Sequence, residues 1–328
     1  MSIEPSTISA PSDKALPRTM MAARVHRFGP PDAIAVEQIE VPQCGDDEVL
    51  VRVHAAGVGP WDSWIRAGKS VLPQPLPLTL GSDVCGVVES VGAHVSAFEP
   101  GDAVFGVTNP RFTGGYAEYA IASTRMIARK PKALSDIEAA SAPVVAVTAW
   151  QMLFKHAAAS QGQTVFVHGG AGNVGAYAVQ LARRGGLRVI ASALDGDAGF
   201  VRDLGASYVV DTRSSSLADF QKCADAVIDT VGGASQTQLF ALAKPGGIVV
   251  SAVSEPSADL AQQHGLRAMF FVVDVNATDL ARLADMFDRR QLTASIGHVL
   301  SLAQARTAHE MLEGKGPRTR GKIVLKVI

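Results

Sequence analysis

The pattern of hydrophobic and polar positions changes character after the first third of the chain. From about Met21 to Ala142, short apolar runs of β type alternate with turns rich in glycine and proline, as in EVLVRVHAAGV at 48–58 and DVCGVVESVG at 83–92. Short strands at this spacing are typical of a compact, barrel-like β domain. We therefore predict such a domain for this part of the chain.

From about Pro143 onward, strand-like runs alternate with runs that have helical spacing, which predicts βαβ units on a parallel sheet. The predicted helices lie at 135–154, 173–186, 199–206 and 277–292, and the predicted strands at 164–170, 187–193, 208–211, 225–233, 246–254 and 267–275. A strand pattern at 295–302, a helix pattern at 303–314 and a closing strand pattern at 321–328 follow. This last stretch either extends the parallel sheet or returns to the first domain.

The amino-acid composition excludes several classes of protein for this chain. Of the 328 residues, 47% are hydrophobic and 19% charged, which is typical of a globular chain. The formal net charge of -1 predicts neither a nucleic-acid partner nor attachment to an anionic membrane, and no apolar run is long enough to span a bilayer. Three cysteines without a CxxC pair argue against a disulfide framework. The polar N-terminus lacks the apolar core of a secretory signal, so we expect a cytoplasmic protein.

A glycine-rich segment follows the predicted strand at 164–170. It reads Gly170-Ala171-Gly172-Asn173-Val174-Gly175 and opens a predicted helix, so it fits the GxGxxG pattern in the right context. In that pattern the first glycine allows a tight turn, the second lets the backbone approach a pyrophosphate, and the third lets helix and strand pack closely. Backbone N–H groups at the helix start favour phosphate. We predict a dinucleotide site here.

The end of the next predicted strand bears on which dinucleotide is bound. NAD-specific sites usually place an acidic side chain there to bind the ribose 2′-hydroxyl. This strand offers Ser192 instead, which leaves room for a 2′-phosphate, although Asp195 and Asp197 follow closely. Arg213 is the nearest downstream cation that could reach the phosphate. NADPH is therefore preferred, and NADH stays open.

Ordered motifs along nearly the whole chain from Met21 carry a family resemblance. They include AARVHRFGPP at 22–31, VRVHAAGVGPWDSWIRAGK at 51–69, LPLTLGSDVCGVVESVG at 76–92 and the terminal GKIVLKV. The chain thereby resembles the medium-chain dehydrogenase/reductase superfamily, and specifically its zinc-independent, zeta-crystallin-like quinone oxidoreductase branch. The resemblance implies an α/β protein with a GroES-like β-rich catalytic domain and a Rossmann domain built on a doubly wound parallel sheet.

The resemblance also implies a division of the chain. We expect a flexible N-terminal tail at 1–20, a catalytic domain at 21–144, a dinucleotide-binding domain at 145–288, and a C-terminal segment at 289–328 that returns to the catalytic domain. Relatives commonly dimerise through the edge of the nucleotide-domain sheet, so a homodimer is expected.

By the same resemblance, the zinc ligands of related alcohol dehydrogenases are missing. Their first cysteine ligand falls in the stretch VGPWDS, their Gly-His-Glu motif appears as Gly81-Ser82-Asp83, and their third ligand position falls near Val144. Zinc needs three or four N, S or O ligands, so no metal is expected. Polarising an alcohol is difficult without a Lewis acid, whereas an electrophilic quinone or enone accepts a hydride more readily.

The resemblance nominates residues for two sites and leaves the catalytic residues unknown. The substrate-pocket candidates are Trp61, Asp62, Trp64 and Phe271; the cofactor candidates are Thr148, Gly170, Gly172, Asn173, Val174, Gly175, Ser192, Arg213, Ala252, Val253 and Phe271. For Thr148 the alternative to a cofactor contact is a hydrogen bond from its hydroxyl to the backbone of its own helix. The chain departs from relatives at Trp64, where many have Tyr, and at Asp197, where NADPH-binding ones often have Lys.

The leading hypothesis is an NADPH-dependent quinone or enone reductase without zinc. The first alternative is a reductase that uses NADH or acts on another activated alkene. The second, of another class, is a nucleotide-binding redox sensor or structural protein with little turnover.

Overall fold

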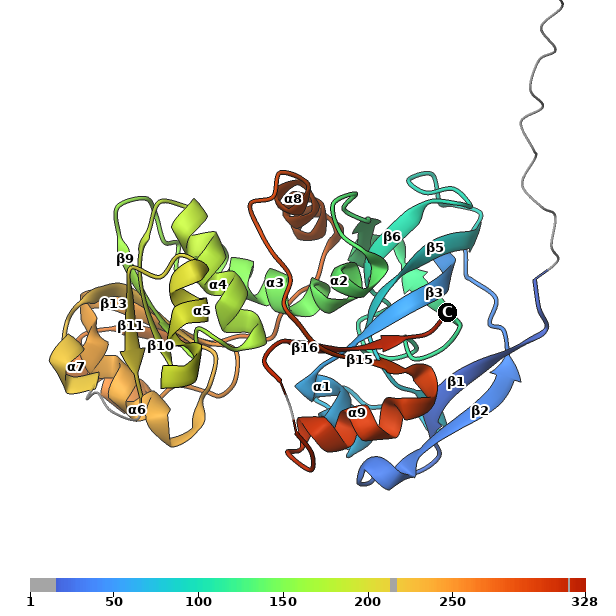
Figure 1. Cartoon of the computed structure of the whole chain (residues 1–328), viewed down its shortest axis with the longest axis horizontal. Helices are drawn as coiled ribbons and strands as arrows, with labels where there is room; N and C mark the ends of the chain where they lie inside the picture. Colours follow the sequence, from blue (N-terminus) through green and yellow to red (C-terminus); the bar gives the residue numbers. More distant parts are fainter. Residues whose placement is uncertain (1–15, 213–216, 318) are drawn as a thin grey trace, which may run out of the picture.

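The structure is a computed structural model, and it describes residues 16–212, 217–317 and 319–328. Most of the tail expected at 1–20 therefore lies outside the described residues, and so does Arg213. Figure 1 shows a β-rich unit, at the right of the view, and a parallel-sheet unit at the left, with helices α2, α3 and α4 between them. The predicted α/β class is confirmed.

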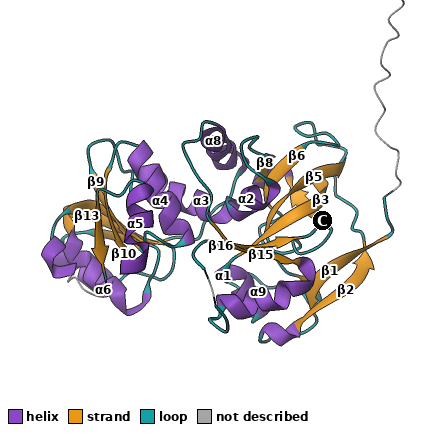
Figure 2. Ribbon diagram, in the orientation of Figure 1, coloured by secondary structure: helices purple, strands orange, loops and turns teal. Residues whose placement is uncertain are grey.

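The β-rich unit holds two sheets (Figure 2). One has three strands in the order β2-β1-β4, and the other has seven, in the order β15-β16-β3-β5-β6-β8 with β7 paired to β3. Their bounds are β1 Thr19–Val25, β2 Ile34–Glu40, β3 Glu48–Val58, β4 Leu78–Thr79, β5 Asp83–Val91, β6 Ala103–Val107, β7 Tyr119–Ser123, β8 Ile127–Arg129, β15 Ile296–Ser301 and β16 Lys322–Lys326.

The C-terminal segment returns to the β-rich unit. Strand β16 pairs antiparallel with β3, and β15 pairs parallel with β16. The helix α9 (Ala305–Leu312) lies beside α1 (Pro60–Arg66), a short helix that the hydrophobic pattern did not predict. Of the two destinations left open for this segment, the structure takes the first domain. We propose domain boundaries at 145–288 and 289–328 on this basis. The first domain begins at Thr19, where β1 starts, rather than at the expected residue 21.

The other sheet is wholly parallel, in the order β11-β10-β9-β12-β13-β14. Its strands are β9 Thr164–His168, β10 Arg188–Ala193, β11 Tyr208–Asp211, β12 Ala224–Asp229, β13 Ala243–Ser251 and β14 Arg267–Phe270. The order reverses next to β9, which is the Rossmann arrangement, and ligands of such sheets collect at that switch point. The strand predicted at 267–275 ends early, because the backbone leaves the sheet after Phe270.

The helices of the parallel-sheet unit follow the predicted pattern with two differences. The helices are α4 Asn173–Arg184, α5 Ala198–Asp203, α6 Gln236–Leu239, α7 Ala258–His264 and α8 Ala277–Asp288, of which α6 and α7 were not predicted. The helix predicted at 135–154 is three pieces: α2 (Asp136–Ser141), α3 (Pro143–Trp150) and a π-helical turn over Gln151–His156. Pro143 divides α2 from α3, since proline cannot donate a backbone hydrogen bond inside a helix.

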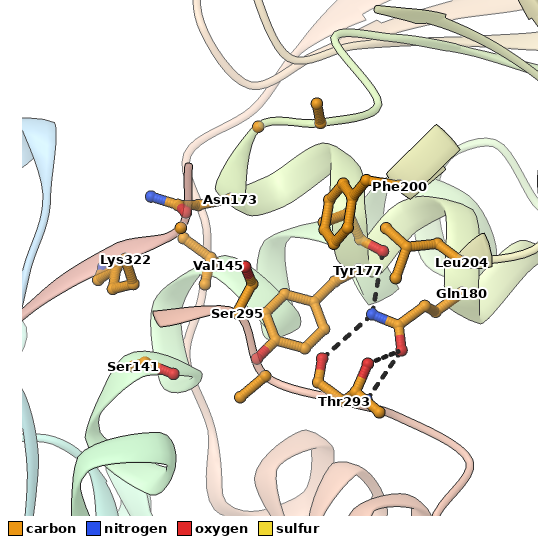
Figure 3. Close-up of a pocket in the computed structure, with 15 residues that line it drawn as sticks. Ser141, Val145, Asn173, Tyr177, Gln180, Phe200, Leu204, Thr293, Ser295 and Lys322 are labelled. Carbon is orange, nitrogen blue, oxygen red and sulfur yellow. Dashed lines mark hydrogen bonds between the residues drawn. The ribbon is translucent and has the colours of Figure 1, made fainter. Parts of the chain in front are cut away.

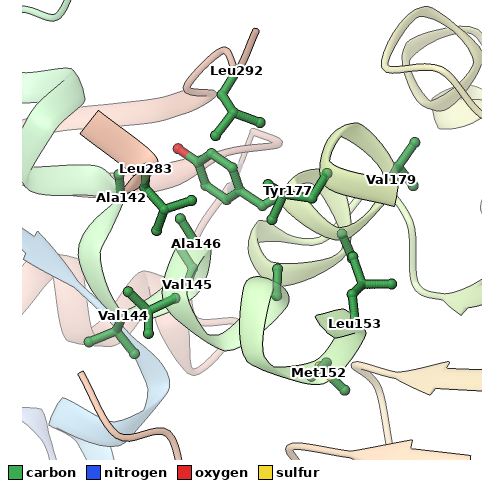
Figure 4. Packing of buried hydrophobic residues seen from close by; sticks show 14 of the residues in the cluster. Ala142, Val144, Val145, Ala146, Met152, Leu153, Tyr177, Val179, Leu283 and Leu292 are labelled. Atoms are coloured by element: carbon green, nitrogen blue, oxygen red, sulfur yellow. The ribbon is translucent and has the colours of Figure 1, made fainter. Parts of the chain in front are cut away.

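A single buried cluster joins the two units across α3. Every residue of α3 except Trp150 is buried, so this helix contacts neighbours on all sides. Figure 4 shows Val145 and Ala146 of α3 near Tyr177 of α4, with Leu283 of α8 and Leu292 beside them. No helix in the described part of the chain is long and apolar enough to span a membrane.

Candidate cofactor and acceptor site

The glycine-rich loop connects β9 to α4 at the switch point of the parallel sheet. The left-handed backbone falls at Gly169 (φ 82°), one residue before the motif, so the tight turn predicted for Gly170 belongs to its neighbour. A Cβ on Gly175 would lie 2.1 Å from the Gly169 carbonyl oxygen. This close approach of helix to loop is the packing role predicted for the third glycine. Gly172 is the N-cap of α4, which leaves the first N–H groups of that helix without intrahelical partners.

Ser192, near the end of β10, is hydrogen-bonded to the glycine-rich loop and to His168. Its Oγ accepts a hydrogen bond from the Gly169 N–H at 3.0 Å and lies 2.7 Å from Nδ1 of His168. His168 reaches Ser235 through its other ring nitrogen at 3.0 Å. Burial lowers the pKa of His168, which keeps the ring neutral and able to accept from Ser192. The Ser192 hydroxyl is thus engaged inside the protein rather than turned toward a cofactor phosphate.

A cavity of about 80 Å³ begins at this loop (Figure 3). Gly172 and Asn173 of the loop line it, and so do Ser295, Gly321 and Lys322 of the C-terminal segment. Figure 3 shows Asn173 and Lys322 at one end and Phe200 at the other. The cavity therefore lies between the nucleotide loop and a segment that belongs to the β-rich unit.

The other cofactor candidates of the parallel-sheet unit lie at the carboxyl ends of neighbouring strands. Ala252 and Val253 directly follow β13, and Phe271 directly follows β14, where its N–H bonds to the Ser251 carbonyl at 3.2 Å. The Phe271 ring lies 4.3 Å from the ring of His156. All three are on the sheet edge that carries the glycine loop, because parallel strands end at one edge.

Thr148 lies in the middle of α3 and is buried. Its hydroxyl donates to the Val144 carbonyl at 2.7 Å, the helix-internal bond that was the alternative to a cofactor contact. A role toward the cofactor stays a prediction.

The two tryptophans of α1 have different surroundings. The indole Nε1 of Trp61 donates to Oγ of Ser82 at 2.9 Å, and its ring meets the edge of Phe112 at a centroid distance of 6.4 Å. Trp64 is 51% exposed. Trp61 is therefore fixed between two parts of the β-rich unit, whereas Trp64 is free to contact a ligand at the surface.

Asp62 lies between these two tryptophans in the sequence of α1 and is fully buried. Its Oδ2 accepts from the Gly59 N–H at 2.8 Å and from the Tyr116 hydroxyl at 3.0 Å. Burial is the main cause that raises the pKa of this carboxyl to about 7. In this position Asp62 caps the start of α1. Its nomination as a residue of the substrate pocket stays a prediction.

A buried ion pair occupies the region that matches the zinc ligands of related enzymes. Nζ of Lys322 lies 3.0 Å from Oδ2 of Asp83, and Oδ1 of Asp83 accepts from the Val144 N–H at 3.1 Å. The ammonium also lies 4.3 Å from the centroid of the Trp61 ring. Burial raises the pKa of Asp83, and the adjacent ammonium opposes that rise.

These residues do not fit a zinc ion. Oγ of Ser82 accepts a hydrogen bond from the Trp61 indole, Val144 offers an aliphatic side chain, and the Asp83 carboxylate is already paired with a cation. A dication beside the Lys322 ammonium would be repelled. Within the described residues, no three His, Cys, Asp or Glu side chains come together as a metal-binding group.

Sequence reasoning missed Lys322 and the role of His168. Lys322 is a single cation at the start of the apolar run IVL, and a charge at the edge of such a run usually faces solvent. Its partner Asp83 was identified only as a position in a metal motif. The pairing joins residues 239 positions apart, so no local pattern indicates it.

The chain matches two family models. Residues 45–132 match the alcohol dehydrogenase GroES-like domain, and residues 204–325 match a model described as zinc-binding dehydrogenase. The second match covers none of the positions discussed above as zinc ligands, which lie from Val58 to Val144.

Individual relatives extend over most of the chain. The quinone oxidoreductase of Pongo abelii is 31% identical over 326 residues, which covers 94% of this chain and 98% of that protein. The 2-methylene-furan-3-one reductase of Solanum lycopersicum is 35% identical, covering 72% of this chain and 63% of that protein. Among solved structures, the quinone oxidoreductase of Coxiella burnetii superposes with a TM-score of 0.87 at 34% identity, covering 94% of this chain and 100% of that one.

Proposed function

This chain belongs to the medium-chain dehydrogenase/reductase superfamily, and we propose that it transfers a hydride from NADPH to a quinone or an α,β-unsaturated carbonyl without zinc. Membership makes it an NAD(P)H-dependent oxidoreductase. The names of its relatives support the proposed acceptors, since one group is called quinone oxidoreductase and another reduces 2-methylene-furan-3-one, an enone.

The observation that carries the proposal is the pairing of Lys322 with Asp83 in the region where zinc enzymes of the family hold their metal. Oxidation of an alcohol needs a group that acidifies the hydroxyl, and a zinc ion is what supplies it in such enzymes. An acceptor that is already electrophilic has no such requirement. The chain thus keeps the glycine-rich loop for a dinucleotide, while the residues at the zinc position of related enzymes do not fit a zinc ion. This combination supports reduction of quinones and enones.

The residues of this chain contribute binding, orientation and exclusion of water. When bound, the nicotinamide cofactor supplies a hydride from its C4 atom. The N–H groups at the start of α4 would hold the pyrophosphate, because a helix start favours negative charge. Trp61 offers a flat, fixed wall for a planar acceptor. The product oxyanion can take its proton from water, so no side chain is assigned as a general acid.

We also propose an oligomeric state and a cellular location. In the described part of the chain, β14 is an edge strand of the parallel sheet, which supports a homodimer in which two such edges pair. We also propose a cytoplasmic location, on the low cysteine count.

The proposal is tested by following oxidation of NADPH and of NADH by the purified protein, with a panel of quinones and enones as acceptors. We expect turnover with acceptors of both kinds, and faster turnover with NADPH than with NADH. Tight binding of a dinucleotide without oxidation across the whole panel would instead support the redox-sensor alternative.

A further inference from the structure

Arg320 of the C-terminal segment contacts the parallel-sheet unit at the start of α5. Its Nη1 is paired with Oδ1 of Asp197, and its guanidinium lies 4.0 Å from the centroid of the Phe200 ring. Two residues further along, Lys322 is paired with Asp83 in the β-rich unit. The short segment 320–322 is therefore tied to both units by ion pairs.

Asp197 lies where a dinucleotide fold distinguishes its cofactors. It comes four residues after the last residue of β10, and position 2′ of the adenosine ribose lies near the end of that strand in such folds. Phe200 lines the same cavity as Gly172 and Asn173 of the glycine loop. The pair is thus adjacent to the cavity that begins at the nucleotide loop.

The Ser192 side chain is not available to contact the ribose 2′ position. Its hydroxyl is buried and is engaged by the Gly169 N–H and by His168. The Arg320 and Asp197 side chains, in contrast, are 37% and 28% exposed, so a ligand group can reach them.

We propose that the Arg320–Asp197 pair selects between NADPH and NADH, on the premise of the proposed function that this sheet edge binds a nicotinamide dinucleotide. With NADPH, Arg320 turns from the Asp197 carboxylate to the 2′-phosphate. With NADH, Arg320 stays on Asp197, and that carboxylate accepts the ribose 2′-hydroxyl. One residue attracts the phosphate and the other repels it.

The chemistry of the two side chains supports these roles. A guanidinium matches a phosphate with two parallel N–H donors, and stacking on Phe200 holds it in place before the ligand arrives. A carboxylate close to a phosphate raises the free energy of the complex by like-charge repulsion. Asp197 therefore limits the preference for NADPH that Arg320 creates, and the balance between them sets the cofactor.

Binding of cofactor fragments tests the pair without any turnover. The probes are adenosine 2′,5′-bisphosphate and adenosine 5′-monophosphate, with dissociation constants measured by titration calorimetry on the full chain. For Arg320→Gln we expect binding of the bisphosphate to weaken about tenfold, the loss of one charge-assisted contact, while binding of the monophosphate changes by less than about twofold. For Asp197→Asn we expect the bisphosphate to bind more tightly and the monophosphate more weakly.

Arg306→Gln is the matched control, because Arg306 is also paired with a carboxylate, Glu310, but on the exposed face of α9. It should leave both dissociation constants unchanged. Equal losses for the two probes in Arg320→Gln, or no change of preference in Asp197→Asn, would overturn the inference and leave the nucleotide site intact. Failure of both probes to bind the unmodified protein would overturn the proposed function together with the inference.

Discussion

Lys322 and Asp83 form a buried ion pair, with Nζ 3.0 Å from Oδ2 and the two side chains 2% and 0% exposed. Removing two charges from water is costly, and their attraction repays that cost only when geometry is good and other hydrogen bonds are present. Here Asp83 also accepts the Val144 N–H, and the ammonium faces the Trp61 ring. The pair therefore links β5, β16, α3 and α1 at one point beside the nucleotide loop.

Breaking the pair from one side should be strongly destabilising. In Lys322→Met the Asp83 carboxylate stays buried without its cation, which costs about 3–5 kcal/mol of unfolding free energy. Chemical denaturation at neutral pH measures the change. Lys322→Met combined with Asp83→Asn should recover part of the loss, since no buried charge is then left unpaired.

Lys326→Met is the control for this substitution, because Lys326 ends the same strand and is exposed. Its effect on unfolding should stay within about 0.5 kcal/mol. A loss in Lys322→Met no larger than in this control would show that the ion pair contributes nothing to stability.

The buried carboxyl of Asp62 should make the free energy of unfolding depend on pH. Burial raises its pKa to about 7 in the folded protein from an ordinary value of 3.8. Between these two values the folded state holds a proton that the unfolded state has lost, so stability falls as pH rises from about 4 to 7 and is level above. Asp62→Asn cannot ionise, so it should lack this fall, which amounts to as much as about 4 kcal/mol.

The measurement is the free energy of unfolding of both proteins across that pH range, expressed as a difference. Asp32→Asn, a change at an exposed carboxyl, is the matched control and should follow the unmodified protein. A constant difference between the unmodified protein and Asp62→Asn at every pH would contradict the raised pKa.

The close approach at Gly175 should make any side chain there incompatible with nucleotide binding. An alanine Cβ would lie 2.1 Å from the Gly169 carbonyl oxygen, and the loop must move to admit it. Strain of this kind costs about 1–3 kcal/mol, so Gly175→Ala should weaken binding of adenosine 5′-monophosphate at least about fivefold. Gly199→Ala, whose Cβ meets nothing within 4 Å, should bind normally. Equal affinities of the two variants would show that the loop is not the binding site.

Ser192 should affect both cofactors alike. Ser192→Ala removes the acceptor of the Gly169 N–H, and leaving such a group unsatisfied costs about 1–3 kcal/mol. We expect weaker binding of adenosine 2′,5′-bisphosphate and of adenosine 5′-monophosphate by the same factor, measured by calorimetry. A loss confined to the bisphosphate would instead support the contact with the 2′-phosphate that the sequence suggested.

Local patterns predicted the parallel-sheet unit well. The strand, glycine loop and helix around 164–186 were identified because each has its own signal: an apolar run, three spaced glycines and a helical period. The break at Pro143 was missed, because apolar residues continue without interruption on both sides of it. The short helix α1 was missed for a similar reason, since seven residues are too few to show a period.

The contacts that define the site could not be predicted in the same way. Lys322 and Asp83 are paired across 239 positions, and Arg320 and Asp197 across 123. Such pairs depend on how the C-terminal segment crosses between the units, which no local period encodes. The sequence shows each of these four residues, but it does not show which of them are paired.

Transfer of deuterium tests the central claim most directly. The purified protein, shown by metal analysis to contain no stoichiometric zinc, is given an enone and NADPH that carries deuterium on the transferred face of C4, with a chelator present. The account predicts one deuterium on the β-carbon of the product, found by mass spectrometry, at a rate that the chelator does not change. A product without deuterium, or a reaction that stops with the chelator and returns with added zinc, would contradict it.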